Sequence, residues 1–145
     1  NTLSFMLSAT TGVPVSGQSR CTATAKSPTS GLIGDSQAGG FWPAELKFAG
    51  FDGIVLSGRS PKPVYLWVHD GQAEIRPAEH LWGRETAEVQ AAIRQELGDE
   101  RVRVLQIGIA GALHHQRSLA TDGNGFNRLP LPVPELAAGA EHGFQ

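Results

Sequence analysis

The sequence predicts an α+β fold in which short-stranded β-sheets carry inserted helices. Short apolar or alternating runs recur along the chain and are bounded by Gly, Pro and Ser. Two segments between these runs have helix signals, one of them with helical periodicity, but strands and helices do not alternate strictly, so the α/β class is disfavoured. The length of 145 residues, with 18 Gly and 9 Pro, is typical of one turn-rich domain.

The chain opens with two predicted strands joined by a loop. Residues 3–7 form a short apolar run. In residues 20–26 side chains of two kinds alternate, with the β-branched ones on one face. This period of two is typical of a half-buried strand. Residues 11–17 carry Gly, Pro and Ser without periodicity and are predicted to form the connecting loop.

A long loop and a short helix are expected next. Residues 27–40 have neither strand nor helix periodicity and consist mostly of small and polar side chains, which predicts a loop. Residues 41–50 then show helix signals, with Pro43 in the first turn and Gly50 at the stop.

A strand and a hairpin are predicted in the middle of the chain. Residues 53–58 form an apolar run that predicts a buried strand, and residues 64–69 predict another. Asp70-Gly71 is a preferred two-residue hairpin turn, after which residues 72–76 return as a strand.

The second helix is predicted over residues 85–97. Its apolar face repeats every four residues, at Val89, Ile93 and Leu97, and Gly98 supplies the stop. Residues 101–108 are expected to close the fold as a strand.

The C-terminal part differs in composition from the rest. Residues 121–145 contain prolines at alternate positions, Pro130, Pro132 and Pro134, which favours an extended polyproline conformation. The residues after Pro134 are mainly Ala, Gly and Glu, with little to bury. We expect this tail to be peripheral.

Charge and composition exclude several function classes. Lys and Arg total 12 and Asp and Glu total 14, without a long block of one sign, so we expect neither nucleic acid nor a membrane as partner. The apolar runs are far shorter than the roughly 18 residues that a membrane span needs, which indicates a soluble protein. The cytoplasm is its default compartment. The single Cys21 excludes an internal disulfide and a complete iron-sulfur ligand set.

Catalytic groups and metal ligands are not evident in the sequence. His114 and His115 are adjacent and would point in different directions, so a metal site is disfavoured. Cys21 lacks an evident histidine partner, and a nucleophile elbow is absent.

The junction between the glycine-rich loop and the first helix, residues 31–47, is the most informative segment. Small residues allow a ligand to approach the backbone, and helix-start N–H groups favour anionic or polar ligands. Arg20 could reach a phosphate, and Trp42 could stack on a flat ligand. The alternatives are a turn that only permits tight packing, a solvated charge at Arg20 and a core role for Trp42.

Several of these segments together resemble the N-terminal domain of tungsten-containing aldehyde ferredoxin oxidoreductases. The matching strings are AKSPTSG at 25–31, GDSQAGGFWPAELKFAGFDGIVLSG at 34–58, KPVYLWV at 62–68 and AEHLWG at 78–83. The resemblance covers residues 1–111 and implies a partial tungstopterin-binding domain, with residues 112–145 as a divergent segment and Pro-rich tail. In the family, two pterins hold tungsten, and later domains supply the iron-sulfur cysteines and the aldehyde site.

The resemblance also implies roles for individual residues. Arg20 matches a phosphate-binding arginine, and Gln37 and Gly39 match a loop that meets the pterin and a bridging magnesium ion. Ala38 and Gly40 belong to the same cofactor-binding loop. The family usually has Asn at the position of Gln37, a shorter amide with a different reach.

The function implied by the resemblance is oxidation of an aldehyde to a carboxylic acid, with ferredoxin as electron acceptor. This chain would supply the cofactor-binding domain, would not be active alone, and could need a further chain for the missing domains. Two alternatives remain open: a non-catalytic structural or interaction module of the same fold, and a generic anion-binding module.

Overall fold

The structure is a computed structural model, and it describes residues 2–27, 30–58, 60–107 and 135–139. The described residues form strands and two helices in the order β1 Thr2–Leu7, β2 Arg20–Lys26, β3 Ile33–Gly39, α1 Trp42–Phe48, β4 Gly53–Ser57, β5 Val64–His69, β6 Gln72–Pro77, α2 Thr86–Leu97, β7 Arg103–Leu105 and β8 Glu135–Gly139. The prediction of an α+β fold is confirmed.

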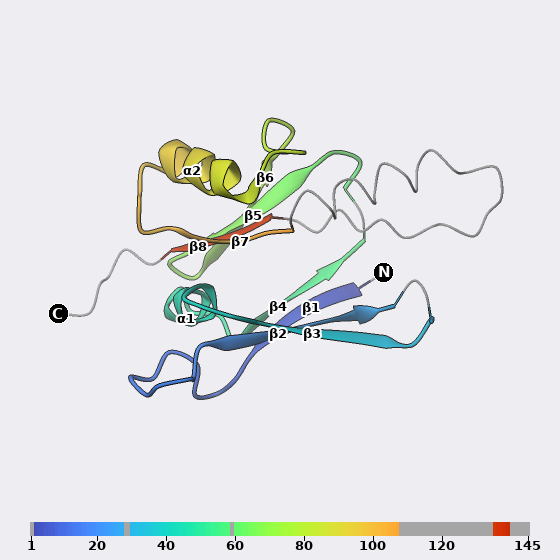
Figure 1. Cartoon of the computed structure of the whole chain (residues 1–145), viewed down its shortest axis with the longest axis vertical. Helices are drawn as coiled ribbons and strands as arrows, with labels where there is room; N and C mark the ends of the chain where they lie inside the picture. The colour runs from blue at the N-terminus through green and yellow to red at the C-terminus, as the bar shows by residue number, and fades with distance from the viewer. Residues whose placement is uncertain (1, 28–29, 59, 108–134, 140–145) are drawn as a thin grey trace.

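Two four-stranded sheets form the body of the molecule. The first sheet has the order β3-β2-β1-β4 and the second has the order β6-β5-β8-β7. All pairs in the first sheet are antiparallel, whereas β5 and β8 of the second sheet are parallel. Figure 1 shows the sheets as two layers, with α1 between them at one end and α2 on the outer side of the second sheet.

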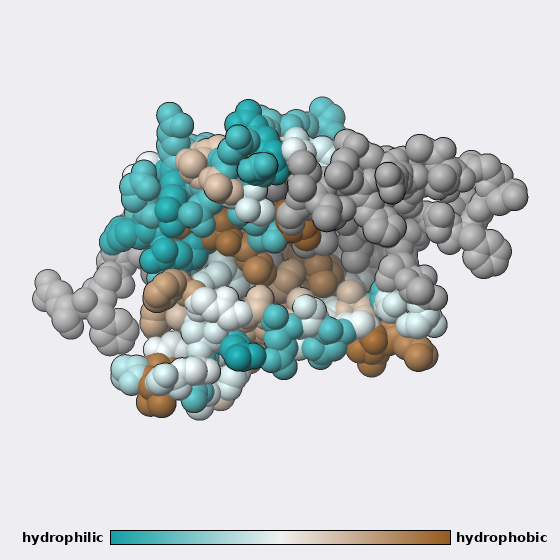
Figure 2. Space-filling view, in the orientation of Figure 1, coloured by the Kyte–Doolittle hydropathy of each residue, from teal (hydrophilic) through white to brown (hydrophobic). Residues whose placement is uncertain are grey.

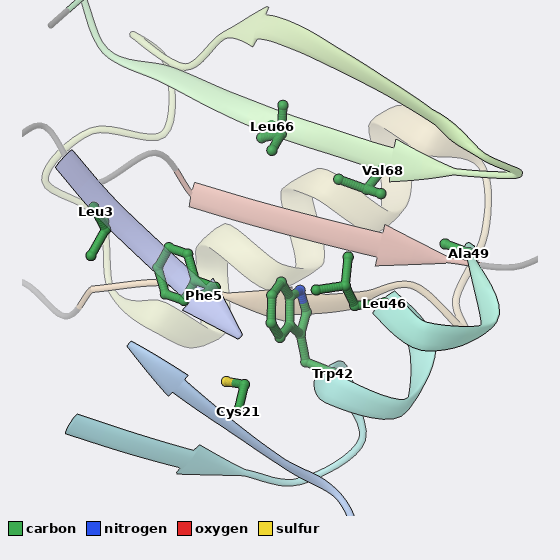
Figure 3. Packing of buried hydrophobic residues seen from close by; sticks show 8 residues of the cluster. All are labelled: Leu3, Phe5, Cys21, Trp42, Leu46, Ala49, Leu66 and Val68. Atoms are coloured by element: carbon green, nitrogen blue, oxygen red, sulfur yellow. The ribbon is translucent and has the colours of Figure 1, made fainter. Parts of the chain in front are cut away.

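The main core fills the space between the two sheets (Figure 3). Leu3 and Phe5 of β1, and Leu66 and Val68 of β5, point inward at alternate positions, as the period of two requires. The buried members of this core are Leu3, Phe5, Cys21, Trp42, Leu46, Ala49, Leu66 and Val68. In Figure 2 the apolar surface visible near the middle of the molecule lies along this layer.

A second core lies between the second sheet and α2. It consists of Tyr65, Ala78, Leu81, Val89, Ile93 and Val102. Val89 and Ile93 are the buried residues of α2, which confirms the predicted apolar face. Gly98 ends the helix at a left-handed φ of 70°, a conformation that favours glycine.

The hairpin prediction is confirmed in detail. Strands β5 and β6 pair antiparallel out to His69 opposite Gln72, which leaves Asp70 and Gly71 as the turn. Both turn residues have positive φ, 44° and 74°, as the favoured two-residue hairpin requires.

The predicted loop over residues 27–40 is wrong, because β3 occupies Ile33–Gly39. All seven of its residues pair with β2. Most of its residues are exposed, so its side chains lack the apolar alternation by which a half-buried strand is recognised. The run at 53–58 does form a strand, β4, but it lies at a sheet edge and Val55 is 59% exposed.

The expected peripheral tail is also wrong for residues 135–139. These residues form β8, which lies between β5 and β7 inside the second sheet. Pro130, Pro132 and Pro134 lie outside the described residues. The strand predicted over 101–108 is shorter in the structure, at Arg103–Leu105.

Neither described helix is long and apolar enough to cross a membrane.

Candidate functional site

The candidate site lies where β2 begins and β3 ends. Arg20 pairs with Gly39 in the antiparallel register, and Thr22 pairs with Gln37. Cys21 and Ala38 point into the main core, so Arg20, Thr22 and Gln37 lie on the opposite, outer face of the first sheet. The strand pairing therefore brings together two residues that are 17 positions apart in the sequence.

Arg20 and Gln37 are in direct contact on this face. Arg20 Nη1 donates a hydrogen bond to Gln37 Oε1 at 3.3 Å, and both side chains are exposed. The contact uses one donor of the guanidinium, which has five. The remaining donors and the Gln37 amide group are therefore available to a phosphate or a polar heterocycle.

Gly39 and Gly40 leave open space beside this pair. A Cβ atom built on Gly40 would meet no atom within 4 Å, and one on Gly39 would meet only the Ser19 carbonyl oxygen at 3.6 Å. Gly40 has a φ of 97°, so position 40 favours glycine because of its backbone conformation in the turn after β3, and not because neighbouring atoms exclude a side chain. An external group could approach this backbone closely.

Ala38 is the candidate residue that the structure does not bring to the site. Its side chain is half-buried against the main core, on the opposite face from Gln37. Its role in the described structure is packing beneath the site.

The loop from residue 8 to residue 19 positions the start of β2. The buried Thr11 hydroxyl accepts a hydrogen bond from Ser8 N at 3.1 Å and lies 3.5 Å from the Arg20 carbonyl oxygen, to which it donates. Gly12 has a φ of 91°, and a Cβ there would lie 3.0 Å from Phe48 Cε1. No role is predicted for Thr11 from the sequence, although a polar residue beside a glycine in a loop is a common turn signal.

Trp42, at the start of α1, does not have the ligand-stacking role that the sequence allowed. Trp42 is only 4% exposed and makes an edge-to-face contact with Phe5, with ring centroids 6.1 Å apart, so it cannot stack on an external ligand. The core alternative for Trp42 is therefore correct. The helix has seven residues and Pro43 lacks an N–H, so its N-terminus alone makes no anion site.

Phe41 is the exposed aromatic residue at this junction. It is 69% exposed, and the Arg103 guanidinium carbon lies 4.7 Å from its ring centroid. This cation–π contact ties the start of α1 to β7 of the second sheet. Nearby, burial raises the pKa of Glu45, and the charges of Arg103 and Arg101 oppose that rise.

Outside the Arg20–Gln37 pair, the described titratable groups whose residue types are typical of a nucleophile or a metal ligand include Cys21 and His80. Burial raises the pKa of the Cys21 thiol, which keeps it protonated and inert. Among the described residues, no group of three or more His, Cys, Asp or Glu could hold a metal ion. His80 instead contacts Glu96, with Nε2 and Oε2 3.2 Å apart.

Comparisons with known proteins agree on one family. The family model "Aldehyde ferredoxin oxidoreductase, N-terminal domain" matches residues 1–127, and so passes residue 111, where the resemblance in the sequence ended. The tungsten-containing aldehyde ferredoxin oxidoreductase of Pyrococcus furiosus is 46% identical over 101 residues, which are 70% of this chain and 16% of that protein. The Pyrococcus abyssi protein of the same name is 40% identical over 77% of this chain and 18% of its own length.

Two further similar proteins carry different names. The aliphatic sulfonate oxidoreductase, WOR-like subunit, of Pyrococcus furiosus is 37% identical over 52% of this chain and 12% of its own length. A solved structure of the active-site complex BamBC of benzoyl coenzyme A reductase with 1,5-dienoyl-CoA superposes with a TM-score of 0.73 at 40% identity. The match covers 77% of this chain and 17% of that one.

Proposed function

Because the chain belongs to the aldehyde ferredoxin oxidoreductase N-terminal domain family, we propose that it supplies the cofactor-binding surface of a tungsten-pterin oxidoreductase. The chain spans about a sixth of the length of the curated relatives that it matches. The observation that carries the proposal is the Arg20–Gln37 pair on the open face of the first sheet, beside the unfilled space at Gly39 and Gly40.

The residues of this face fit a phosphorylated pterin. Arg20 presents a guanidinium, which matches phosphate oxygens in charge and geometry. Gln37 presents an amide that can both donate and accept, as the polar edge of a pterin ring requires, and its oxygen could serve a bridging magnesium ion. Gly39 and Gly40 leave room for the ring to approach the backbone.

The proposed reaction is the oxidation of an aldehyde. When bound, the tungsten-pterin group supplies the two-electron redox chemistry. The aldehyde and one water give a carboxylic acid, two protons and two electrons, and ferredoxin accepts the electrons through an iron-sulfur cluster held by the remaining length of the enzyme. This chain binds and orients the cofactor, is inactive alone, and acts in the cytoplasm.

Substrate choice does not reside in this domain. Similar proteins include one named for aliphatic sulfonates and one solved with a dienoyl-CoA, as well as the aldehyde oxidoreductases. A domain shared across such different substrates is suited to hold a common cofactor. The aldehyde is proposed because the Pyrococcus furiosus and Pyrococcus abyssi relatives, 46% and 40% identical to this chain, are named for it.

Metal and pterin analysis tests the proposal. The chain is purified together with the remaining length of the enzyme, and tungsten and released pterin are measured per chain. We expect both to be present in a ratio of two pterins to one metal. Protein that oxidises aldehydes without either would contradict the proposal, and protein that holds neither and is inactive would favour the non-catalytic module.

A further inference from the structure

Arg103 of β7 reaches from the second sheet toward the turn that follows β3. Its neighbours Val102 and Val104 pack in the second core, whereas Leu105 packs against the main core. Because side chains alternate along a strand, Arg103 points to the same side as Leu105, toward α1 and the first sheet. Its guanidinium carbon lies 4.7 Å from the centroid of the Phe41 ring. The second sheet therefore contacts the residue that directly follows the two glycines of the candidate site.

The two glycines of this turn depend on neighbouring residues for a fixed conformation. Glycine adopts more backbone conformations than other residues. A Cβ atom built on Gly40 would meet no atom within 4 Å, so surrounding atoms do not restrict this residue. On the β3 side, Gly39 pairs with Arg20, and the Ser19 hydroxyl donates a hydrogen bond to the Gly40 carbonyl oxygen. The first sheet therefore fixes one end of the turn.

Phe41 forms the other end of the turn and the start of α1. Its carbonyl oxygen accepts a hydrogen bond from Glu45 N at 3.1 Å, but its side chain makes no capping hydrogen bond. The ring is 69% exposed, and the Arg103 guanidinium lies over its face. A cation in this position is attracted by the electrons of the ring. Arg103 therefore restrains Phe41 where packing alone leaves it largely in solvent.

The surroundings of Arg103 differ from those of a solvated surface charge. Its side chain is half-buried, and its Nε atom is buried without a hydrogen-bond partner among the described residues. Burial raises the pKa of Glu45, and the charge of Arg103 opposes that rise, so the Glu45 carboxyl group lies within electrostatic range of the guanidinium. The described partners of this cation thus include the Phe41 ring and Glu45, both from the start of α1.

We propose that Arg103 is a positioning residue for the cofactor: through the Phe41 ring, it holds the Gly39-Gly40 turn in the conformation that receives the pterin. A turn that is already ordered loses less conformational entropy when its ligand binds. In this role Arg103 acts through Phe41 and not on the cofactor itself. The inference rests on the proposed function, because it concerns the same cofactor-binding turn.

Hydrogen exchange in the longer enzyme, prepared without cofactor, tests the contact before any cofactor binds. The Glu45 amide reports the start of α1, because it donates to the Phe41 carbonyl oxygen, and the Val89 amide, which donates to Glu85 at the start of α2, is the matched control. Arg103→Gln should speed exchange at Glu45 by about twofold to fivefold and leave Val89 unchanged. Equal acceleration at both amides, or none at Glu45, would overturn the inference.

Conservative variants separate the cation–π contact from general packing. Arg103→Lys keeps the cation and Phe41→Tyr keeps the ring face, so both should leave exchange at Glu45 close to that of the wild type. Arg103→Gln and Phe41→Leu each break the contact, so the double variant should exchange no faster than the more affected single variant. Additive effects of the two disruptive substitutions, or equal effects of the conservative and disruptive ones, would overturn the inference.

Tungsten and pterin content tests the role of the contact in cofactor binding. Under limiting tungstate, the longer enzyme with Arg103→Gln should hold about twofold to fivefold less of both per chain, whereas Arg103→Lys should hold as much as the wild type. If the wild type holds cofactor and Arg103→Gln holds as much, this inference is overturned and the proposed function stands. Wild-type enzyme that holds neither tungsten nor pterin would overturn both.

Discussion

The two sheets share one core but present different outer faces. The second sheet is covered on its outer side by α2, which buries Tyr65, Val89 and Ile93. The outer face of the first sheet is covered by no described element and carries exposed Arg20 and Gln37. The second sheet therefore has both faces packed, whereas the first keeps one open face, which is the face that we propose binds the cofactor (Figures 1 and 2).

The largest expected effect is a difference in unfolding free energy between a substitution under α2, on the covered face of the second sheet, and one on the open face of the first sheet. Ile93→Ala removes a fully buried side chain from between α2 and the second sheet, and should lower the free energy of unfolding by about 2–5 kcal/mol. Val55→Ala on the outer face of the first sheet should change it by less than about 0.5 kcal/mol. Urea denaturation measures the free energy of unfolding of the two variants. Similar losses in Ile93→Ala and Val55→Ala would mean that the outer faces of both sheets are buried.

The pH dependence of the free energy of unfolding tests whether Tyr65 of the second sheet is buried. Tyr65 is buried and donates a hydrogen bond from its hydroxyl to Glu96 Oε1 at 2.8 Å. Burial, together with the Glu96 contact, raises the pKa of Tyr65 from 10 to about 12. The raised pKa contributes stability that is complete below pH 10 and is lost as the pH rises toward 12, by up to about 3 kcal/mol.

This loss can be assigned to one side chain, because the chain has one tyrosine. Between pH 10 and 12, the wild-type protein should lose more stability than Tyr65→Phe, and tyrosinate absorbance should report the ionisation directly. Identical pH profiles for the two proteins, or ionisation near pH 10, would show that Tyr65 is not held in a buried site.

The smallest expected effect concerns the amide at the candidate site. Gln37→Asn shortens the side chain by one methylene but keeps the amide, so the tungsten content of the longer enzyme should stay within about twofold. Gln37→Leu, which keeps the approximate size of the side chain and removes the amide, should lower the tungsten content more than Gln37→Asn does. Gln72→Asn, at an exposed glutamine of β6, is the control and should have no effect. Equal tungsten content in the Leu and Asn variants would remove Gln37 from the site.

Much of the fold could be predicted from local signals in the sequence. The helix that contains Val89 and Ile93 and the hairpin at Asp70-Gly71 depend on periodicity and turn residues that lie within a few positions. Strand β3 could not be predicted in this way, because an edge strand exposed on both faces has no apolar alternation. Strand β8 depends on a parallel pairing with β5, some 70 positions away in the chain, which local pattern does not encode.

The candidate site was predicted in part. The resemblance to the family pointed to Arg20 and Gln37, but their contact arises from the β2–β3 register, which required β3 to be a strand. The same register turns Ala38 toward the core. The burial of Trp42 depends on packing against Phe5 of β1, so the sequence left its two roles open.

The most direct test of the binding face compares two arginines. Arg20→Ala and Arg84→Ala are prepared in the longer enzyme, and tungsten and pterin are measured per chain under limiting cofactor. Arg20 lies on the open face of the first sheet, whereas Arg84 is an exposed residue between β6 and α2. Loss of a charge-assisted phosphate contact, worth about 1.5–3 kcal/mol, predicts a roughly tenfold to hundredfold loss of cofactor affinity in Arg20→Ala and none in Arg84→Ala. Full cofactor content in Arg20→Ala would contradict the assignment of this face as the cofactor-binding surface.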